Sequence, residues 1–442
     1  MRRHALLALC LWVIPALFLT GCNDNGDNLS PSGNAITLTV LNSMTLQPHS
    51  PPWVAFQDGR GSWTRVSPTS PGVFTCPVTD PAGAYGFAIP PEYSSGDTVY
   101  FLQATLADAA ALTFPVYVPP AEGFSRGLLD RPAGRAATAR IAPGPNDWTM
   151  QGMVTGVPHS FNHFGTACPH MTSSSYLPDT TPFPYTFTFP AGWPTDCAMI
   201  LLDYSAPYDN GLLYLRRGLN NTAGTTITEN IDFSAPYGGE KHTYEVTERA
   251  TVSVEGAVYL TVDWMMAGGA PLPLRSEAVS SFEYAVIPAA AVTASDRYYL
   301  YAGGVQSGMY TLAWSHAPFT SCELPDPFTC GRSGLTYTGL DHAGASMYDL
   351  RIGNQAEDVE WNAFVTPAWL AAAGSADYTY PDLSGLEGWQ SAWGFETVTY
   401  VYAVENEFDG LLPHYFKYWL PLYAQEPFAD GDYLRAAACQ PD

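Results

Sequence analysis

Short stretches in which apolar and polar residues alternate constrain the fold of this chain more than any other feature. Ile36, Leu38 and Val40 are separated by single threonines. The same period returns in three later stretches, residues 185–189, 258–264 and 398–404. Because successive side chains of a strand point to opposite faces, this period predicts strands with one buried and one polar face, as in antiparallel sheets.

Turn-forming residues separate these stretches. The 442 residues include 39 Gly and 38 Pro without a collagen repeat, which favours many short strands over long helices. We therefore predict an all-β fold of two to four consecutive antiparallel β-sandwich (Ig-like) domains.

One helix signal stands out among the strand signals. Thr366 can cap a helix N-terminus, Pro367 suits its first position, and Gly374 suits the position after its end. About two helical turns are expected here, as a connection too short to organise a core.

The charge balance excludes one class of partner. Lys and Arg together number 18 against 42 Asp and Glu, a formal net charge of −24. A basic surface for phosphate contacts is hard to build from so few cations, so we expect no nucleic-acid binding. The hydrophobic content of 46% and aromatic content of 14% exclude a disordered chain.

The N-terminus has the pattern of an export signal. Arg2, Arg3 and His4 precede an apolar run from Ala5 to Phe18, which is shorter than the roughly 20 residues that span a bilayer as a helix. A secretory signal peptide is therefore a better interpretation than a permanent membrane anchor. The polar residues 23–35 then predict a flexible tether.

Leu19-Thr20-Gly21-Cys22 follows the apolar run and resembles the lipobox of bacterial lipoproteins. The resemblance implies that Cys22 becomes the mature N-terminus and carries a diacylglycerol and an acyl chain such as palmitate. Asn23, where an inner-membrane retention signal would place Asp, implies the outer membrane. We expect a lipid-anchored outer-membrane protein whose contact with the membrane is this N-terminal lipid.

Changes of composition predict the domain boundaries. A Pro- and Gly-rich stretch separates a first unit from a second, Gly238-Gly239 precedes a third, and the segment from Glu323 onward holds 18 acidic and four basic residues. The predicted units are the signal peptide 1–21, the tether 22–35, β-sandwich domain 1 at 36–118, a linker at 119–147, β-sandwich domain 2 at 148–238, a β-rich domain 3 at 239–322 and an acidic, Trp-rich β domain 4 at 323–442. Domains 3 and 4 can also form one unit.

The cysteines predict disulfides. Of eight, Cys10 leaves with the signal and Cys22 carries lipid, and an even number in an exported chain favours pairing of the rest. Proximity along the chain pairs four of them, and elimination pairs the last two: Cys168 with Cys197, Cys322 with Cys330, and Cys76 with Cys439.

Further motifs resemble a group of multi-domain, β-rich bacterial outer-membrane lipoproteins that has no established activity to carry over. They are Trp53-Val-Ala-Phe-Gln-Asp-Gly-Arg-Gly-Ser-Trp63, Tyr85-Gly86-Phe87, Arg216-Arg217-Gly218-Leu219 and Tyr380-Pro381-Asp382-Leu383-Ser384.

Two clusters near the C-terminus are candidates for a site. Glu405, Glu407 and Asp409 follow each other at every second residue, so their carboxylates share one side of a strand, where Ca²⁺ or solvent would relieve their repulsion. The pattern predicts either a calcium site or a solvated acidic strand end.

The second cluster is aromatic. Trp361, Trp389 and Trp393 are candidate ligand-binding residues, because exposed aromatic faces hold sugar rings in carbohydrate-binding sandwiches. The alternative is that these rings fill a core.

No short catalytic motif is present. We therefore expect a non-enzymatic surface module, binding or structural, with a glycan or protein partner at the cell surface. Two alternatives stay open: an extracellular hydrolase that uses acidic residues of the C-terminal segment such as Asp382 or Glu387, and a purely structural envelope spacer.

Overall fold

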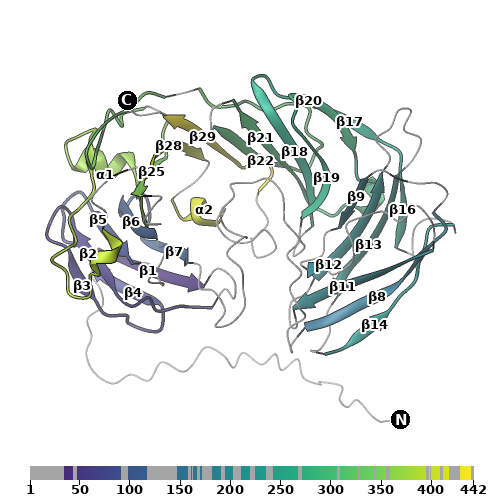
Figure 1. Cartoon of the computed structure of the whole chain (residues 1–442), viewed down its shortest axis with the longest axis horizontal. Helices are drawn as coiled ribbons and strands as arrows, with labels where there is room; N and C mark the ends of the chain where they lie inside the picture. Colours follow the sequence, from purple (N-terminus) through teal and green to yellow (C-terminus); the bar gives the residue numbers. More distant parts are fainter. Residues whose placement is uncertain are drawn as a thin grey trace, which may run out of the picture.

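The protein, described here from a computed structural model, is built almost entirely of strands, which confirms the predicted all-β class. Figure 1 shows an arch, with the N-terminal strands on one side, strands β8 to β16 on the other, and a long sheet joining them across the top. The structure describes residues 34–42, 47–90, 98–116, 147–157, 161, 163–166, 170–171, 182–190, 195–202, 211–219, 224–234, 242–266, 271–305, 309–326, 328–342, 344–354, 359–394, 398, 400–408, 412–417 and 429–439.

The long sheet has 12 strands, and its neighbours are antiparallel except for β26 and β6, which are parallel. It draws strands from the three ranges predicted as domains 1, 3 and 4. In spatial order the strands are β19 (Pro271–Glu277), β18 (Ala257–Met265), β21 (Arg297–Gly304), β22 (Tyr310–Ser315), β29 (Tyr433–Cys439), β28 (Tyr400–Phe408), β25 (Met347–Asn354), β26 (Val359–Val365), β6 (Thr98–Thr105), β5 (Ala84–Ile89), β2 (Val54–Asp58) and β3 (Thr64–Val66).

A smaller sheet packs on the N-terminal end of the long one and completes a sandwich. Its strands are β4 (Val73–Pro77), β1 (Ala35–Asn42) and β7 (Ala111–Val116), and β1 and β7 are parallel. Ile36, Leu38 and Val40 of β1 are fully buried in the shared core, as their alternation predicts. Helix α2 (Leu412–Lys417) contributes to the same core.

Two further sheets form the other side of the arch. One comprises β10 (His170–Met171), β11 (Phe183–Pro190), β8 (Asp147–Thr155), β14 (Thr226–Thr228) and β15 (Ile231–Asp232), and the other comprises β16 (Thr243–Val246), β13 (Gly211–Leu219), β12 (Thr195–Leu202) and β9 (His163–Thr166). The apolar strand β12 is buried on both faces, since Met199 and Leu201 meet the first sheet while Ile200 and Leu202 pack toward β18 and β19. A continuous apolar run, and not an alternating one, encodes this middle layer.

Short elements cover the remaining faces. They are the pair β17 (Arg249–Ser253) and β20 (Ser281–Ala285), the small sheet β23 (Gly331–Ser333), β24 (Thr336–Thr338) and β27 (Tyr378–Thr379), the 3₁₀ turns η2 (Ala289–Ala291) and η3 (Ser391–Trp393), and helix α1 (Pro367–Ala372). Helix α1 confirms the sequence signal: Trp369 donates its backbone N–H to the Thr366 hydroxyl at 3.2 Å, and Gly374 has a φ of 66°.

The cysteine pairing differs from the one predicted by proximity. Cys330 forms a disulfide with Cys439, so neither the Cys322–Cys330 nor the Cys76–Cys439 bridge exists, and Cys76 and Cys322 are free thiols. The reason is the position of the long sheet. Cys330 and Cys439 belong to the core on one of its faces, whereas Cys76 lies in the core on the opposite face.

The predicted Cys168–Cys197 bridge involves one residue outside the described ranges, while Cys197 itself is buried on β12. The predicted signal peptide, Cys22 and residues 23–33 of the predicted tether also lie outside them, whereas the last tether residue, Ala35, already belongs to β1. Within the described residues, no helix is both long and apolar enough to cross a bilayer.

Candidate functional site

The candidate ligand-binding tryptophans pack together at the boundary between the long sheet and η3. Trp361 on β26 and Trp393 on η3 are 7% and 3% exposed, while Trp389 is partly buried. The centroid of the Trp389 ring lies 6.0 Å from that of Trp361 and 5.6 Å from that of Trp393. The ring of Trp53, the residue before β2, is the fourth member of the group and lies 5.8 Å from Trp393. The expectation of exposed sugar-stacking faces is therefore corrected for Trp361 and Trp393, whose rings fill the core.

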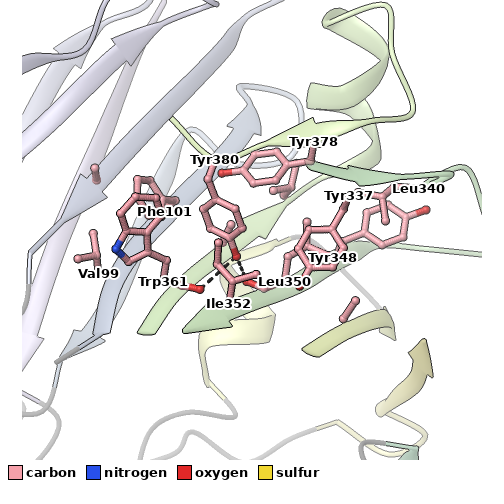
Figure 2. Packing of buried hydrophobic residues seen from close by; sticks show 14 of the residues in the cluster. Val99, Phe101, Tyr337, Leu340, Tyr348, Leu350, Ile352, Trp361, Tyr378 and Tyr380 are labelled. Atoms are coloured by element: carbon pink, nitrogen blue, oxygen red, sulfur yellow. Dashed lines mark hydrogen bonds between the residues drawn. The ribbon is translucent and has the colours of Figure 1, made fainter. Parts of the chain in front are cut away.

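Figure 2 shows the buried aromatic residues that surround the Trp361 ring. Tyr380, which follows β27, points into the sheet, and its hydroxyl donates to the backbone oxygens of Leu350 at 2.5 Å and Trp361 at 3.1 Å. The Trp361 ring lies 5.9 Å from Phe101 on β6. Segments more than 250 residues apart in the chain thus share one aromatic core, a contact that a local sequence pattern cannot report.

The loop that carries Trp389 is fastened to the N-terminal sandwich. The Trp53 indole N–H donates to the backbone oxygen of Gly388 at 3.2 Å, and the Arg65 guanidinium donates to that of Glu387 at 3.2 Å. Both hydrogen bonds are accepted by backbone oxygens of the loop, so they fix its backbone without involving its side chains.

The carboxylates on β28 each have a basic partner. Glu405 is 4% exposed, and its Oε1 lies 2.6 Å from Nδ1 of His342, whose side chain is about half exposed. Burial raises the pKa of Glu405, and the imidazole of His342 acts in the opposite direction. Among the described residues, none provides a hydrogen-bond partner for the second oxygen of Glu405.

Glu407 lies two residues further along the same face. Its carboxylate lies 3.5 Å from Arg435 on β29 and accepts a hydrogen bond from the Tyr433 hydroxyl at 3.1 Å. Asp409, the third predicted calcium ligand, lies outside the described residues. In the part of the chain that the structure describes, no three metal-binding side chains gather at one point.

The candidate hydrolase carboxylates are exposed and separate from these pairs. Asp382 accepts a hydrogen bond from the backbone N–H of Ser384 at 2.9 Å, and the Ser384 hydroxyl and N–H lower the pKa of Asp382. A carboxylate stabilised in its ionised form is poorly suited to donate a proton as a general acid. Glu387 is also exposed, and its described contact is through its backbone oxygen.

A groove on the N-terminal sandwich was not anticipated from the sequence. It has a volume of about 720 Å³ and runs between β3 and β4, the edge strands of the two sheets. Its lining mixes apolar side chains, Phe56, Val66, Cys76 and Pro77, with polar ones, Ser62, Thr64, Ser67, Thr75, Thr79, Asp58 and Arg65. The Asp58 carboxylate already accepts from the backbone N–H groups of Thr79 and Asp80, at 2.9 and 3.1 Å.

An ion cluster around Arg217 was also not anticipated from the sequence. Arg217 on β13 lies 2.9 Å from Asp196 and 2.7 Å from Asp296, and its guanidinium stacks 5.6 Å from the Trp264 ring. Asp296 is 1% exposed, so the guanidinium compensates a buried charge. The signal in the sequence was the pair Arg216-Arg217 directly after an apolar run in the same strand, because a partly buried cation favours an acidic partner.

Comparisons with known proteins place the chain in no family. No family model matches it, and no curated protein sequence matches it. Two solved structures share 7% sequence identity with it: the Bacillus anthracis TIE protein, at a TM-score of 0.15, and a streptococcal ancillary pilin, at a TM-score of 0.13. Each match covers 66% of this chain, with 51% of the first protein and 98% of the second, so the chain spans about half of the first. Scores this low carry no argument about fold or function.

Proposed function

We propose that this protein is a lipid-anchored component of the bacterial outer membrane that acts as a non-enzymatic structural or binding module at the cell surface. The proposal of a non-enzymatic role rests on the observation that the candidate functional side chains are paired with other side chains or buried in the core. Glu405 pairs with His342, Glu407 pairs with Arg435, and Trp361 packs in the core. Residues engaged in this way stabilise a rigid body and offer little to a substrate.

The lipid anchor is tested by replacing its acceptor. Wild type and Cys22→Ser are expressed with an alkyne-labelled fatty acid, and lipid incorporation and membrane fractionation are measured. Wild type should carry the label and sediment with the outer membrane, whereas C22S should lose the label. Ser32→Ala, in the same polar segment, serves as the matched control. Labelled C22S in the membrane fraction would contradict the anchor.

The binding role has a second candidate, carbohydrate recognition, which the groove between β3 and β4 favours. Several hydroxyls, a carboxylate and a guanidinium supply the mixture of donors and acceptors that a polyhydroxylated ligand needs. Glycan arrays should show retention that falls with Thr75→Val and is unchanged by Thr251→Val, an exposed strand threonine on β17. Equal retention of both variants would remove the groove as the site.

The structural role is tested by cross-linking on intact cells. Recovery of defined envelope proteins, without retention on glycans, would favour the spacer function over carbohydrate binding. Turnover on glycoside or peptide panels that is lost in Asp382→Asn would instead support the hydrolase alternative.

A further inference from the structure

Strand β29 occupies an unusual position, because it is inserted between two strands that come from distant parts of the chain. On one side residues Tyr433–Ala436 pair with Tyr310–Ala313 of β22, and on the other side Leu434–Cys439 pair with Ala403–Phe408 of β28. Without β29 the long sheet divides into two parts, β19-β18-β21-β22 and β28-β25-β26-β6-β5-β2-β3. The strand is therefore the joint between the two sides of the arch (Figure 1).

The sequence of β29 is poorly suited to hold such a joint by packing alone. Its centre is Ala436, Ala437 and Ala438, which are 0 to 4% exposed. Alanine has a low strand propensity and brings little apolar area to a core. By contrast, the central residues of β12 are Met, Ile and Leu.

The ion pairs of the strand add little. Arg435 lies 3.5 Å from Glu407 and 3.4 Å from Glu323, but the Glu323 side chain is 83% exposed. Exposed pairs of this length contribute weakly and are screened by salt. The strand is held further by the burial of Leu434, by the hydrogen-bond ladder on both edges and by one covalent bond.

The covalent bond is the disulfide from Cys439, the last residue of β29, to Cys330 on the segment that leads into β23. Cys439 also lies in the core on the face of the sheet that β23, β24 and β27 cover. The bond thus fastens the end of the joint strand to a part of the fold that does not depend on β29 for its own strand pairing.

We propose that β29 is a redox-locked joint: it enters between β22 and β28 after those strands have formed, and oxidation of Cys330 and Cys439 holds it there. The two thiols lose two protons and two electrons to form the S–S bond, and a disulfide oxidant accepts both electrons and becomes a dithiol. Reduction by a dithiol reverses the step and releases the strand, which separates the two sides of the arch while each keeps its own core.

The test is hydrogen exchange on the full chain in its oxidised form and as C330A/C439A. A variant is used because a reductant would act on every disulfide of the protein. The variant should lose at least tenfold of its amide protection in β22, β28 and β29, while protection in β5 and β12 stays within twofold. Cys322→Ala, which removes a free thiol, should leave all five strands unchanged.

Two results would overturn the proposal. Equal protection of β22, β28 and β29 in wild type and variant would mean that the ladder alone holds the joint. An equal loss in β5 and β12 would mean that the disulfide supports the whole fold and not this joint. Oxidised wild type treated with a dithiol reductant should reproduce the pattern of the variant in the joint strands.

Discussion

Nδ1 of His342 lies 2.6 Å from Oε1 of Glu405, so an imidazole from the segment before β25 is paired with a carboxylate buried in the long sheet. The other oxygen of Glu405 has no hydrogen-bond partner in the part of the chain that the structure describes, which makes the charged form costly. This pair leads to a prediction about pH.

Burial raises the pKa of Glu405 above its ordinary value of 4.5. The folded protein therefore holds a proton that the unfolded chain has released, and the contribution of Glu405 to stability is present below the unfolded pKa and is lost as pH rises through the folded pKa. Glu405→Gln removes this titration. Relative to wild type, the free energy of unfolding of E405Q should increase as pH rises from about 4 to about 7.

Urea denaturation at a series of pH values measures this difference. The control is Glu407→Gln, a neighbouring carboxylate whose side chain is 36% exposed. A constant difference between E405Q and wild type across the range would show that Glu405 is not destabilised by its surroundings.

The disulfide predicts a loss of stability when it is removed. It links residues 109 positions apart, and constraint of the unfolded chain by a loop of about 100 residues is worth about 5 kcal/mol. In C330A/C439A the joint strands β22, β28 and β29 should unfold at a lower denaturant concentration, with a free energy of unfolding smaller by about that amount, whereas the transition of β5 and β12 stays in place and Cys322→Ala should change little. Identical midpoints for wild type and C330A/C439A would contradict the prediction.

The tryptophan cluster predicts different costs for two neighbouring rings. Trp361→Ala removes a buried ring and its hydrogen bond of 2.7 Å to the backbone oxygen of Trp393, and should lower the free energy of unfolding by about 3 kcal/mol or more. Trp389→Ala should cost less, because its ring is partly exposed. Chemical denaturation followed by tryptophan fluorescence measures both. The reverse order would mean that the ring burial described above is wrong.

We predict that the ion cluster of Arg217, Asp196 and Asp296 requires a guanidinium at position 217. Its guanidinium donates to both oxygens of Asp296 and to one oxygen of Asp196, and the compact ammonium of lysine does not reproduce this planar fork. Arg217→Lys should lower the free energy of unfolding by about 2 kcal/mol, since buried Asp296 keeps a cation beside it but loses part of its hydrogen bonding.

Arg60→Lys is the matched control for that substitution. Arg60 is exposed and lies 5.7 Å from the Trp369 ring, a contact worth less than about 1 kcal/mol. Equal effects of R217K and R60K would show that bridging by the guanidinium is unimportant.

The sequence by itself determined the local features of this protein: the buried face of a strand, the ends of a helix and the all-β class. The alternation of Ile36, Leu38 and Val40 specifies a strand with one buried face, and β1 has that face. Thr366 and Gly374 specify the two ends of α1, because capping is a matter of neighbouring backbone groups. The all-β class follows from many such local signals.

Tertiary structure decided the rest, because the relevant contacts join residues far apart in the chain. Proximity in sequence could not place Cys439 beside Cys330, since only the insertion of β29 between β22 and β28 brings them to the same face of the long sheet. For the same reason the spacing of Glu405 and Glu407 placed both on one face of β28 but could not reveal that His342 and Arg435 meet them there. The period of a strand reports which side chains share a face, and only the packed sheet determines what faces them.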